Sequence, residues 1–368
     1  MKNILYFLLL ITLSQYSQDQ INDTIQGTKQ NLDEVIIQSV RVKYSSPITH
    51  SNVSKSDLSS KNLGQDLPVL LTFLPSIVTT SDAGAGIGYT GIRIRGVSAQ
   101  STNITINGIP FNDPESHGTY WVNLPDFTSS VENMQVQRGV GTSTNGSGAF
   151  GASINILTDA ISKNPFAEIS NSVGSYNTLK HTVKFSTGQL NDSFELSGRL
   201  SKIDSDGYID RAYSDLKSYF LQAAYIKGNT LIKALTFGGH EKTYQSWYGV
   251  SKEELLENRR QNPYTYENEI DNYKQDHYQF HWNQKLNERW STNLGLNYTY
   301  GRGYFEQYRE DDSIDTYGGI LVSDLDQQGN KTGTTDLIRR RWLDNNFYVL
   351  NASANYKTSK LDLMFNSS

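Results

Sequence analysis

Beyond about residue 160, the chain alternates between apolar and polar residues with a period of two. Between Arg289 and Tyr300, every second position is apolar, aromatic or threonine, namely Trp290, Thr292, Leu294, Leu296, Tyr298 and Tyr300. The pattern recurs at Leu179 to Ser186, Phe194 to Leu200 and Tyr348 to Tyr356. A period of two predicts β-strands with one apolar and one polar face.

Aromatic residues stand at both ends of the apolar stripes. A transmembrane β-barrel has this pattern, because an apolar band faces lipid between aromatic girdles while the interior stays polar. A soluble antiparallel sandwich also alternates, but long strands with aromatic ends favour the barrel. We therefore expect an all-β membrane barrel, with about eight or nine strands in this part of the chain.

The connections between these strands differ in length. Two are long and polar, roughly Tyr244 to Asn272 and Tyr304 to Arg340, whereas Lys227 to Thr230 and Leu286 to Arg289 are tight. Outer-membrane barrels have long extracellular loops and short periplasmic turns, so the long connections are expected to face outward. Loop residues that could contact a ligand are Trp247, Tyr248, Tyr264, Tyr266, Glu310, Asp311 and Asp312.

The N-terminal part of the chain has a different character, with short strand-like segments separated by glycines. These segments are Thr90 to Gly96, Thr105 to Pro110, Val136 to Val140 and Gly148 to Ile156. In this order they resemble the plug domain of TonB-dependent outer-membrane receptors. The resemblance implies an α+β plug inside the barrel lumen, in the outer membrane of a Gram-negative bacterium.

The expected organisation is a signal peptide at 1–17, a periplasmic segment at 18–44, a plug at 45–160 and barrel strands at 161–368. The apolar stretch from Ile4 to Leu13 is shorter than the roughly 20 residues of a membrane-spanning helix, which favours a signal peptide. Barrels of this family have about 22 strands. Because an open sheet leaves unpaired edges in lipid, we expect this sequence to be a fragment of such a receptor.

A short acidic and β-branched segment precedes the plug. It resembles the Ton box, the energy-coupling segment of the family, and consists of Leu32, Asp33, Glu34, Val35, Ile36, Ile37 and Gln38. Such a segment can add as a strand to the exposed sheet edge of a partner. The alternative is that it forms the first strand of the plug.

The resemblance also implies roles for individual plug residues. Contacts with the barrel wall are expected for Arg93, Arg95, Glu132 and Arg138, unless these are merely solvated charges. Three turns, Ser81 to Tyr89, Ser98 to Thr102 and Asn112 to Trp121, are expected to face the ligand chamber. Their candidate ligand-binding residues are Ser81, Tyr89, Ser98, Gln100, Asn112, His117, Tyr120 and Trp121, for which packing against the barrel is the alternative.

Composition narrows the possible functions. The net charge is −5 with 19% charged residues, which argues against nucleic-acid binding, and the absence of cysteine excludes thiolate zinc sites. Two stretches fit G-x-G-x-x-G, but strand-like segments follow both, whereas a dinucleotide site needs a helix there. His277 and His281 share one strand face and are expected to line the lumen. We therefore expect no enzyme activity, no cofactor and no metal site.

The resemblance implies ligand-gated active transport, with the TonB–ExbB–ExbD complex, outer-membrane lipid and a small ligand as partners and a monomer as the assembly. The favoured ligand is a ferric siderophore or another iron complex, and cobalamin, haem and glycans are alternatives. A sensor or adhesin without import is the second class considered.

Overall fold

A computed structural model describes residues 41–42, 47–140, 150–318, 320 and 322–367. The expected signal peptide and the expected Ton box lie outside these residues. None of the helices in the described part is both long and apolar enough to cross a membrane.

Residues before 160 form two small sheets with short helices between their strands. The larger sheet has the order β1-β6-β7-β4-β5, with β1 at His50–Ser54, β6 at Val131–Arg138, β7 at Ala152–Thr158, β4 at Thr102–Ile106 and β5 at Ile109–Pro110. Its neighbours are antiparallel except for β4 and β7. The smaller sheet pairs β2 (Ile77–Ser81) with β3 (Thr90–Ile94). The helical elements are α3 (Lys55–Ser59), α4 (Leu67–Leu70), η1 (Ala99–Ser101), η2 (Trp121–Asn123) and η3 (Phe127–Ser130).

Strands follow both glycine-rich stretches, as the sequence predicted. Gly86 to Gly91 leads into β3, and Gly151 is followed directly by β7. Ile104, Ile106, Met134, Ile154 and Ile156 from the larger sheet are almost fully buried in one apolar core. The glycines therefore serve turns and close packing in this domain.

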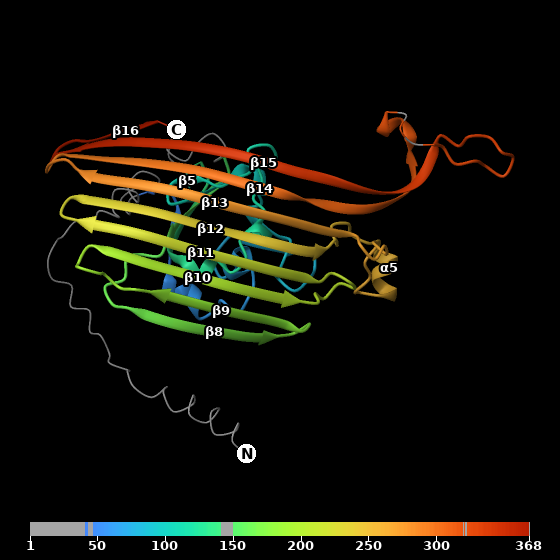
Figure 1. The fold of residues 1–368 in the computed structure, drawn as a ribbon, viewed down its shortest axis with the longest axis horizontal. Coiled ribbons are helices and arrows are strands. Elements are labelled where there is room, and N and C mark those ends of the chain that lie inside the picture. The colour runs from blue at the N-terminus through green and yellow to red at the C-terminus, as the bar shows by residue number, and fades with distance from the viewer. Residues whose placement is uncertain (1–40, 43–46, 141–149, 319, 321, 368) are drawn as a thin grey trace, which may run out of the picture. The chain divides into compact units, whose positions relative to one another are not determined.

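Residues after 160 form a third sheet, of nine strands, in which neighbours in sequence pair in antiparallel register. Figure 1 shows the strands side by side in chain order, from β8 in green to β16 in red. Their bounds are β8 Phe166–Gly174, β9 Thr178–Ser186, β10 Phe194–Ser205, β11 Ser214–Lys227, β12 Thr230–Tyr244, β13 Ile270–Lys285, β14 Trp290–Ser313, β15 Thr334–Lys357 and β16 Asp362–Ser367. The helix α5 (Lys252–Glu257) lies in the connection between β12 and β13.

Burial in this sheet is the reverse of burial in a soluble sandwich. In β9 the polar residues Lys180, Thr182 and Lys184 are buried, while Val183 and Phe185 are exposed. The same inversion places exposed Leu296 beside buried Asn297 in β14. An apolar outer face and a polar inner face are the arrangement of a membrane barrel. The structure therefore decides between the two interpretations of the alternation.

One predicted connection is wrong in its extent. The segment from Tyr304 to Arg340 was expected to be a loop, but β14 continues to Ser313 and β15 begins at Thr334. The extension is held by cross-strand contacts such as the ion pair between Arg340 and Glu306 at 2.5 Å and the guanidinium of Arg340 over the ring of Tyr304. Polar residues occupy both faces there, so no apolar alternation marked the strands.

A close approach between the two domains depends on a glycine in β12. A Cβ atom at Gly239 would lie 2.4 Å from the carbonyl oxygen of Asn123 and 2.7 Å from Cδ of Pro125. The backbone that carries η2 and η3 therefore contacts the inner face of the sheet directly.

We expect Gly239→Ala to destabilise the packing between the domains by about 1–3 kcal/mol, because the added methyl group overlaps this backbone. Gly249→Ala is the matched control, since a Cβ there meets open space. Urea denaturation followed by tryptophan fluorescence would compare the two. Equal midpoints would contradict the close approach.

Candidate functional site

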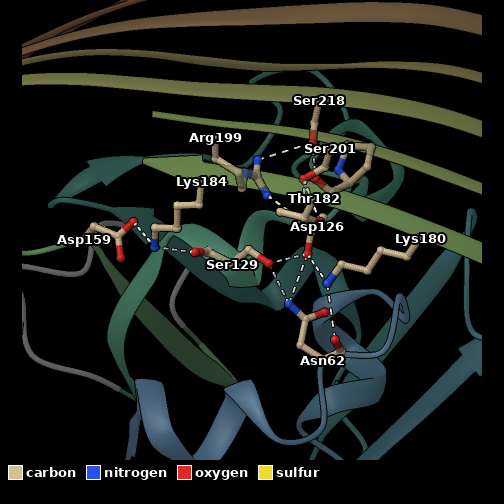
Figure 2. A network of polar contacts seen from close by, with 11 residues as sticks. Asn62, Asp126, Ser129, Asp159, Lys180, Thr182, Lys184, Arg199, Ser201 and Ser218 are labelled. Atoms are coloured by element: carbon tan, nitrogen blue, oxygen red, sulfur yellow. Dashed lines mark hydrogen bonds and ion pairs between the residues drawn. The ribbon is translucent and has the colours of Figure 1, made fainter. Parts of the chain in front are cut away.

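The N-terminal domain is held against the nine-stranded sheet by the carboxylate of Asp126, which lies between Pro125 and η3 (Figure 2). Its Oδ1 lies 2.7 Å from Nζ of Lys180, and its Oδ2 lies 3.6 Å from Nη1 of Arg199. The hydroxyls of Thr182 and Ser201 donate to Oδ2 over 2.7 and 2.6 Å. Two neighbouring strands, β9 and β10, thus direct four side chains at one plug carboxylate.

The domain's own residues complete this site. The amide of Asn62 and the hydroxyl of Ser129 donate to Oδ1 of Asp126 over 3.0 and 2.6 Å. Asp126 has a φ of 51°, in the left-handed region that aspartate tolerates better than most residues. The local turn therefore presents the carboxylate toward the sheet.

Burial makes this ionic cluster decisive for docking. The side chains of Asp126, Lys180 and Arg199 are each at most 2% exposed. The cationic groups of Arg199 and Lys180 hold the pKa of Asp126 well below its usual range, despite burial that opposes ionisation. A cation left here without the carboxylate would be buried and uncompensated.

A second ionic contact lies beside the first (Figure 2). Nζ of Lys184 lies 2.6 Å from Asp159 and donates to the carbonyl of Ser129 over 2.7 Å. Lys55 contacts the other oxygen of Asp159 at 2.7 Å. In the ion pairs that join the two domains, the sheet supplies the cations Lys180, Lys184 and Arg199, and the N-terminal domain supplies the carboxylates Asp126 and Asp159.

The four charged residues expected at the barrel wall make no described polar contact with the nine-stranded sheet. Arg138 donates to the carbonyl of Pro75 and the hydroxyl of Ser51, and Arg95 donates to the carbonyl of Arg138. Glu132 lies 3.6 Å from Lys55, and Arg93 is exposed on β3. The described polar contacts of Arg95, Glu132 and Arg138 are thus internal to the N-terminal domain.

A cavity of about 860 Å³ lies between the domain and the strands β12 to β15. Residues from three parts of the chain line it. The N-terminal domain contributes Asp82, Tyr89, Gly118, Tyr120, Asn123 and the turn from Pro110 to Ser116. The strands contribute Glu241, Asp271, Tyr273, Gln275, His277, Thr299, Phe305 and Leu343 to Phe347. The connection between β12 and β13 contributes Trp247. The cavity lies toward the end of the sheet where the long connections emerge.

The structure brings only some of the expected ligand residues to this cavity. Tyr89, Asn112 and Tyr120 line it. Trp121 is instead buried in the apolar core. The remaining expected residues, Ser81, Ser98, Gln100 and His117, are not among the residues that line the cavity. The hydroxyl of Ser81 accepts a hydrogen bond from the N–H of Gly86, and the carbonyl of Ser98 accepts one from Thr102. Gln100 and His117 are exposed, and His117 has a φ of 58°.

Several lining residues were not foreseen as ligand contacts. Glu241, Asp271 and Tyr273 come from strands whose inward positions could be read from the alternation, but their distance from the plug turns could not. Trp247, by contrast, was named among the loop residues that could contact a ligand. It lines the cavity, and its ring meets that of Tyr89 edge-on at 5.3 Å. His277 lines the interior as predicted, with its ring 5.3 Å from that of Phe111.

Titratable groups of the plug near this cavity are shifted by burial. Burial raises the pKa of Asp82 to about 6 and that of Asp66 to about 8. The hydroxyl of Thr90 donates a hydrogen bond to Asp66 over 2.9 Å, and this bond opposes the rise in the pKa of Asp66. Burial and neighbouring carboxylates raise the pKa of Tyr89, whose hydroxyl donates to Asp271. Acidic groups around Tyr89 therefore share a poorly hydrated environment.

Known proteins resemble both domains. The family model described as the TonB-dependent Receptor Plug Domain matches residues 42–153. The vitamin B12 transporter BtuB of Vibrio vulnificus is 30% identical over 193 residues, and the probable TonB-dependent siderophore receptor PirA of Acinetobacter baumannii is 24% identical over 225 residues. Residues 42–153 thus match the plug of TonB-dependent receptors. The nine-stranded sheet has the fold of the barrel strands in these outer-membrane receptors.

The solved structures support the same fold. The siderophore receptor PirA from Acinetobacter baumannii matches with a TM-score of 0.60 and 16% identity, over 93% of this chain and 48% of that receptor. The curated relatives are covered less fully: the matches span 51% and 58% of this chain, but 29% of BtuB and 28% of PirA. These relatives are transport receptors.

We expect Asp126→Asn to destabilise plug docking by about 3–5 kcal/mol, since it leaves Lys180 and Arg199 buried without a counter-charge. The depressed pKa means that this stabilisation is present above about pH 4 and is lost as the pH falls further. Urea denaturation at several pH values would measure it. Glu132→Gln is the control, because its half-exposed pair should contribute about 1 kcal/mol or less; equal effects would contradict the assignment.

Asp66→Asn should stabilise the plug at alkaline pH relative to acidic pH. The raised pKa means that the neutral carboxyl contributes stability fully below about pH 4, and this contribution is lost as the pH rises toward about 8. Denaturation midpoints of the native and substituted receptors at pH 5 and pH 9 would show it. A difference that stays the same at both pH values would contradict a buried neutral Asp66.

Proposed function

We propose that this chain provides the gate and part of the ligand chamber of a receptor that actively imports a scarce small molecule, in the first place an iron chelate such as a ferric siderophore. The observation that carries the proposal is the cavity between plug and barrel. Its volume of about 860 Å³ lies within the range of about 300–1,000 Å³ that is usual for small-molecule sites. Names of relatives point the same way, because PirA is described as a siderophore receptor.

The interface supports a plug that can move. Asp126 and Asp159 bind the barrel through charged and hydroxyl groups beside a limited apolar contact, in which the ring of Phe127 lies 5.1 Å from that of Phe237. Polar contacts fix geometry by direction and distance, and they can be exchanged for water when the plug shifts. No bond in the ligand needs to change, so the proposal includes no enzymatic step.

We further propose that Leu32 to Gln38 couple the plug to TonB, and through TonB–ExbB–ExbD to the energy of the inner membrane. Such a segment would pair with the sheet edge of TonB through main-chain hydrogen bonds. The name of BtuB makes vitamin B12 the second candidate ligand.

Ile36→Pro should abolish import without abolishing ligand binding, because proline lacks the N–H that strand pairing requires. Cells that express the full-length receptor would be given radiolabelled iron as a ferric trihydroxamate and, in parallel, radiolabelled vitamin B12. We expect iron uptake to fall to the level of cells without the receptor, whereas Ile36→Val retains it. Uptake of vitamin B12 instead would reassign the ligand, and uptake that survives Ile36→Pro would contradict the coupling role.

A further inference from the structure

The lining of the cavity has an uneven charge. Six of its residues are carboxylic acids, Asp82, Asp113, Glu115, Glu241, Asp271 and Asp344, and no lysine or arginine is among the described residues that line it. Asp344 is paired with Arg302 at 3.9 Å, and Asp113 accepts hydrogen bonds from Glu115 and Ser116 of its own turn. The other four acids have no basic partner in the described part of the chain.

This distribution contrasts with the rest of the plug–barrel interface. Around Asp126 and Asp159, the carboxylates of the plug are matched by Lys180, Lys184 and Arg199 of β9 and β10. Across the cavity, the strands β12 and β13 present further acids, Glu241 and Asp271, to the acidic plug turns. Charge is therefore balanced where the plug is attached and unbalanced where the cavity opens.

Four buried polar atoms of the described lining residues also lack a protein partner, Oδ1 of Asn123, Nε1 of Trp247, Oδ1 of Asp271 and Nε2 of His277. Asp271 and His277 are each 4% exposed, and both line the cavity. The hydroxyl of Tyr89 donates a hydrogen bond to Oδ2 of Asp271, and the hydroxyl of Thr299 is hydrogen-bonded to Nδ1 of His277 at 2.9 Å. The other polar atom of each side chain, Oδ1 of Asp271 and Nε2 of His277, has no described hydrogen-bond partner. Buried polar atoms are normally paired, so these two are available to a bound molecule.

Aromatic rings make up much of the remaining lining. Tyr120, Trp247, Tyr273 and Phe305 belong to it together with Tyr89 and Phe111. The ring of Trp247 meets those of Tyr89 and Phe305 edge-on at 5.3 and 5.6 Å. Aromatic faces attract cations as well as apolar surface. A metal ion alone fits less well, since no group of three metal-binding side chains occurs among the described residues.

From the unbalanced carboxylates, the unpaired atoms of Asp271 and His277 and the aromatic walls, we infer that the imported ligand is an amphipathic cation. Its positively charged or hydrogen-bond-donating end lies at Asp271 and Glu241. Its apolar or aromatic body lies against Tyr120, Trp247 and Phe305. This assignment rests on the proposed import function and narrows its ligand. A ferric tris-catecholate carries net negative charge and would be repelled by the same carboxylates. A chelate with a free amine would be attracted.

Binding to the full-length receptor in detergent micelles tests the assignment with two probes that share one ring system, naphthyl-trimethylammonium and naphthalene sulfonate. Quenching of tryptophan fluorescence would give both dissociation constants. We expect the ammonium probe to bind at least about tenfold more tightly, because a charge-assisted contact contributes about 1.5–3 kcal/mol. Tighter binding of the sulfonate, or binding of neither probe at millimolar concentration, overturns the assignment.

Substitutions of cavity residues test whether the ammonium probe binds in the cavity. Asp271→Asn and Asp82→Asn should each weaken binding of the ammonium probe about tenfold, and they act on different domains, so a folding defect in one leaves the other informative. Asp204→Asn is the matched control: it removes the same charge from the same protein, but on a residue of β10 that pairs with Lys202 at 2.6 Å and does not line the cavity. An equal loss in the control would overturn the cavity as the site.

Uptake measurements separate this inference from the import function. A ferric trihydroxamate with a free terminal amine and its succinylated form have the same metal core and opposite net charges. If only the succinylated form is imported, and Ile36→Pro stops that import, the receptor imports an anion and the charge assignment fails alone. If the ammonium probe binds but neither chelate nor vitamin B12 is taken up, the import function fails while the cation site stands.

Discussion

The ionic cluster around Asp126 is the interaction on which the arrangement of the two domains depends. A single carboxylate forms ion pairs with Lys180 and Arg199 of the barrel. It accepts hydrogen bonds from Thr182 and Ser201 of the barrel and from two residues of the plug. All three charges are removed from water, so each ion is tolerated only because the others are present. The position and orientation of the plug are therefore set at this point, where small displacements leave buried charge unpaired.

The cluster follows from the inverted burial of the barrel. Strands with an apolar outer face must present polar groups inward, and a domain placed inside must satisfy those groups or leave room for water. The plug does both. Asp126 and Asp159 satisfy the cations of β9 and β10, Phe127 packs on Phe237, and the close approach at Gly239 excludes side chains from the contact.

The plug is consequently attached to the sheet on one side, and on its other side a cavity lies between it and the sheet. Against β9 and β10 its carboxylates Asp126 and Asp159 have cationic partners, whereas toward β12 to β15 a cavity remains and carboxylates from both domains face it. A ligand that compensates those carboxylates would change the balance of charge on the side that is not anchored. The same domain therefore attaches to β9 and β10 and also lines the cavity.

The sequence by itself determined the classes of structure and where they change. Alternation from Leu179 to Tyr356 predicted the barrel strands and the inward position of His277. The glycine-separated segments predicted the plug. Both predictions depend on local periodicity and on turns that glycine permits. It did not reveal the continuation of β14 and β15, whose polar residues carry no apolar period. Nor could it show that Asp126, rather than Arg93, Arg95, Glu132 or Arg138, meets the barrel, or that Glu241 and Asp271 face Tyr89. Those contacts join residues far apart in the chain, and only the docking of the plug against the sheet decided them, through shape, burial and the pairing of charge.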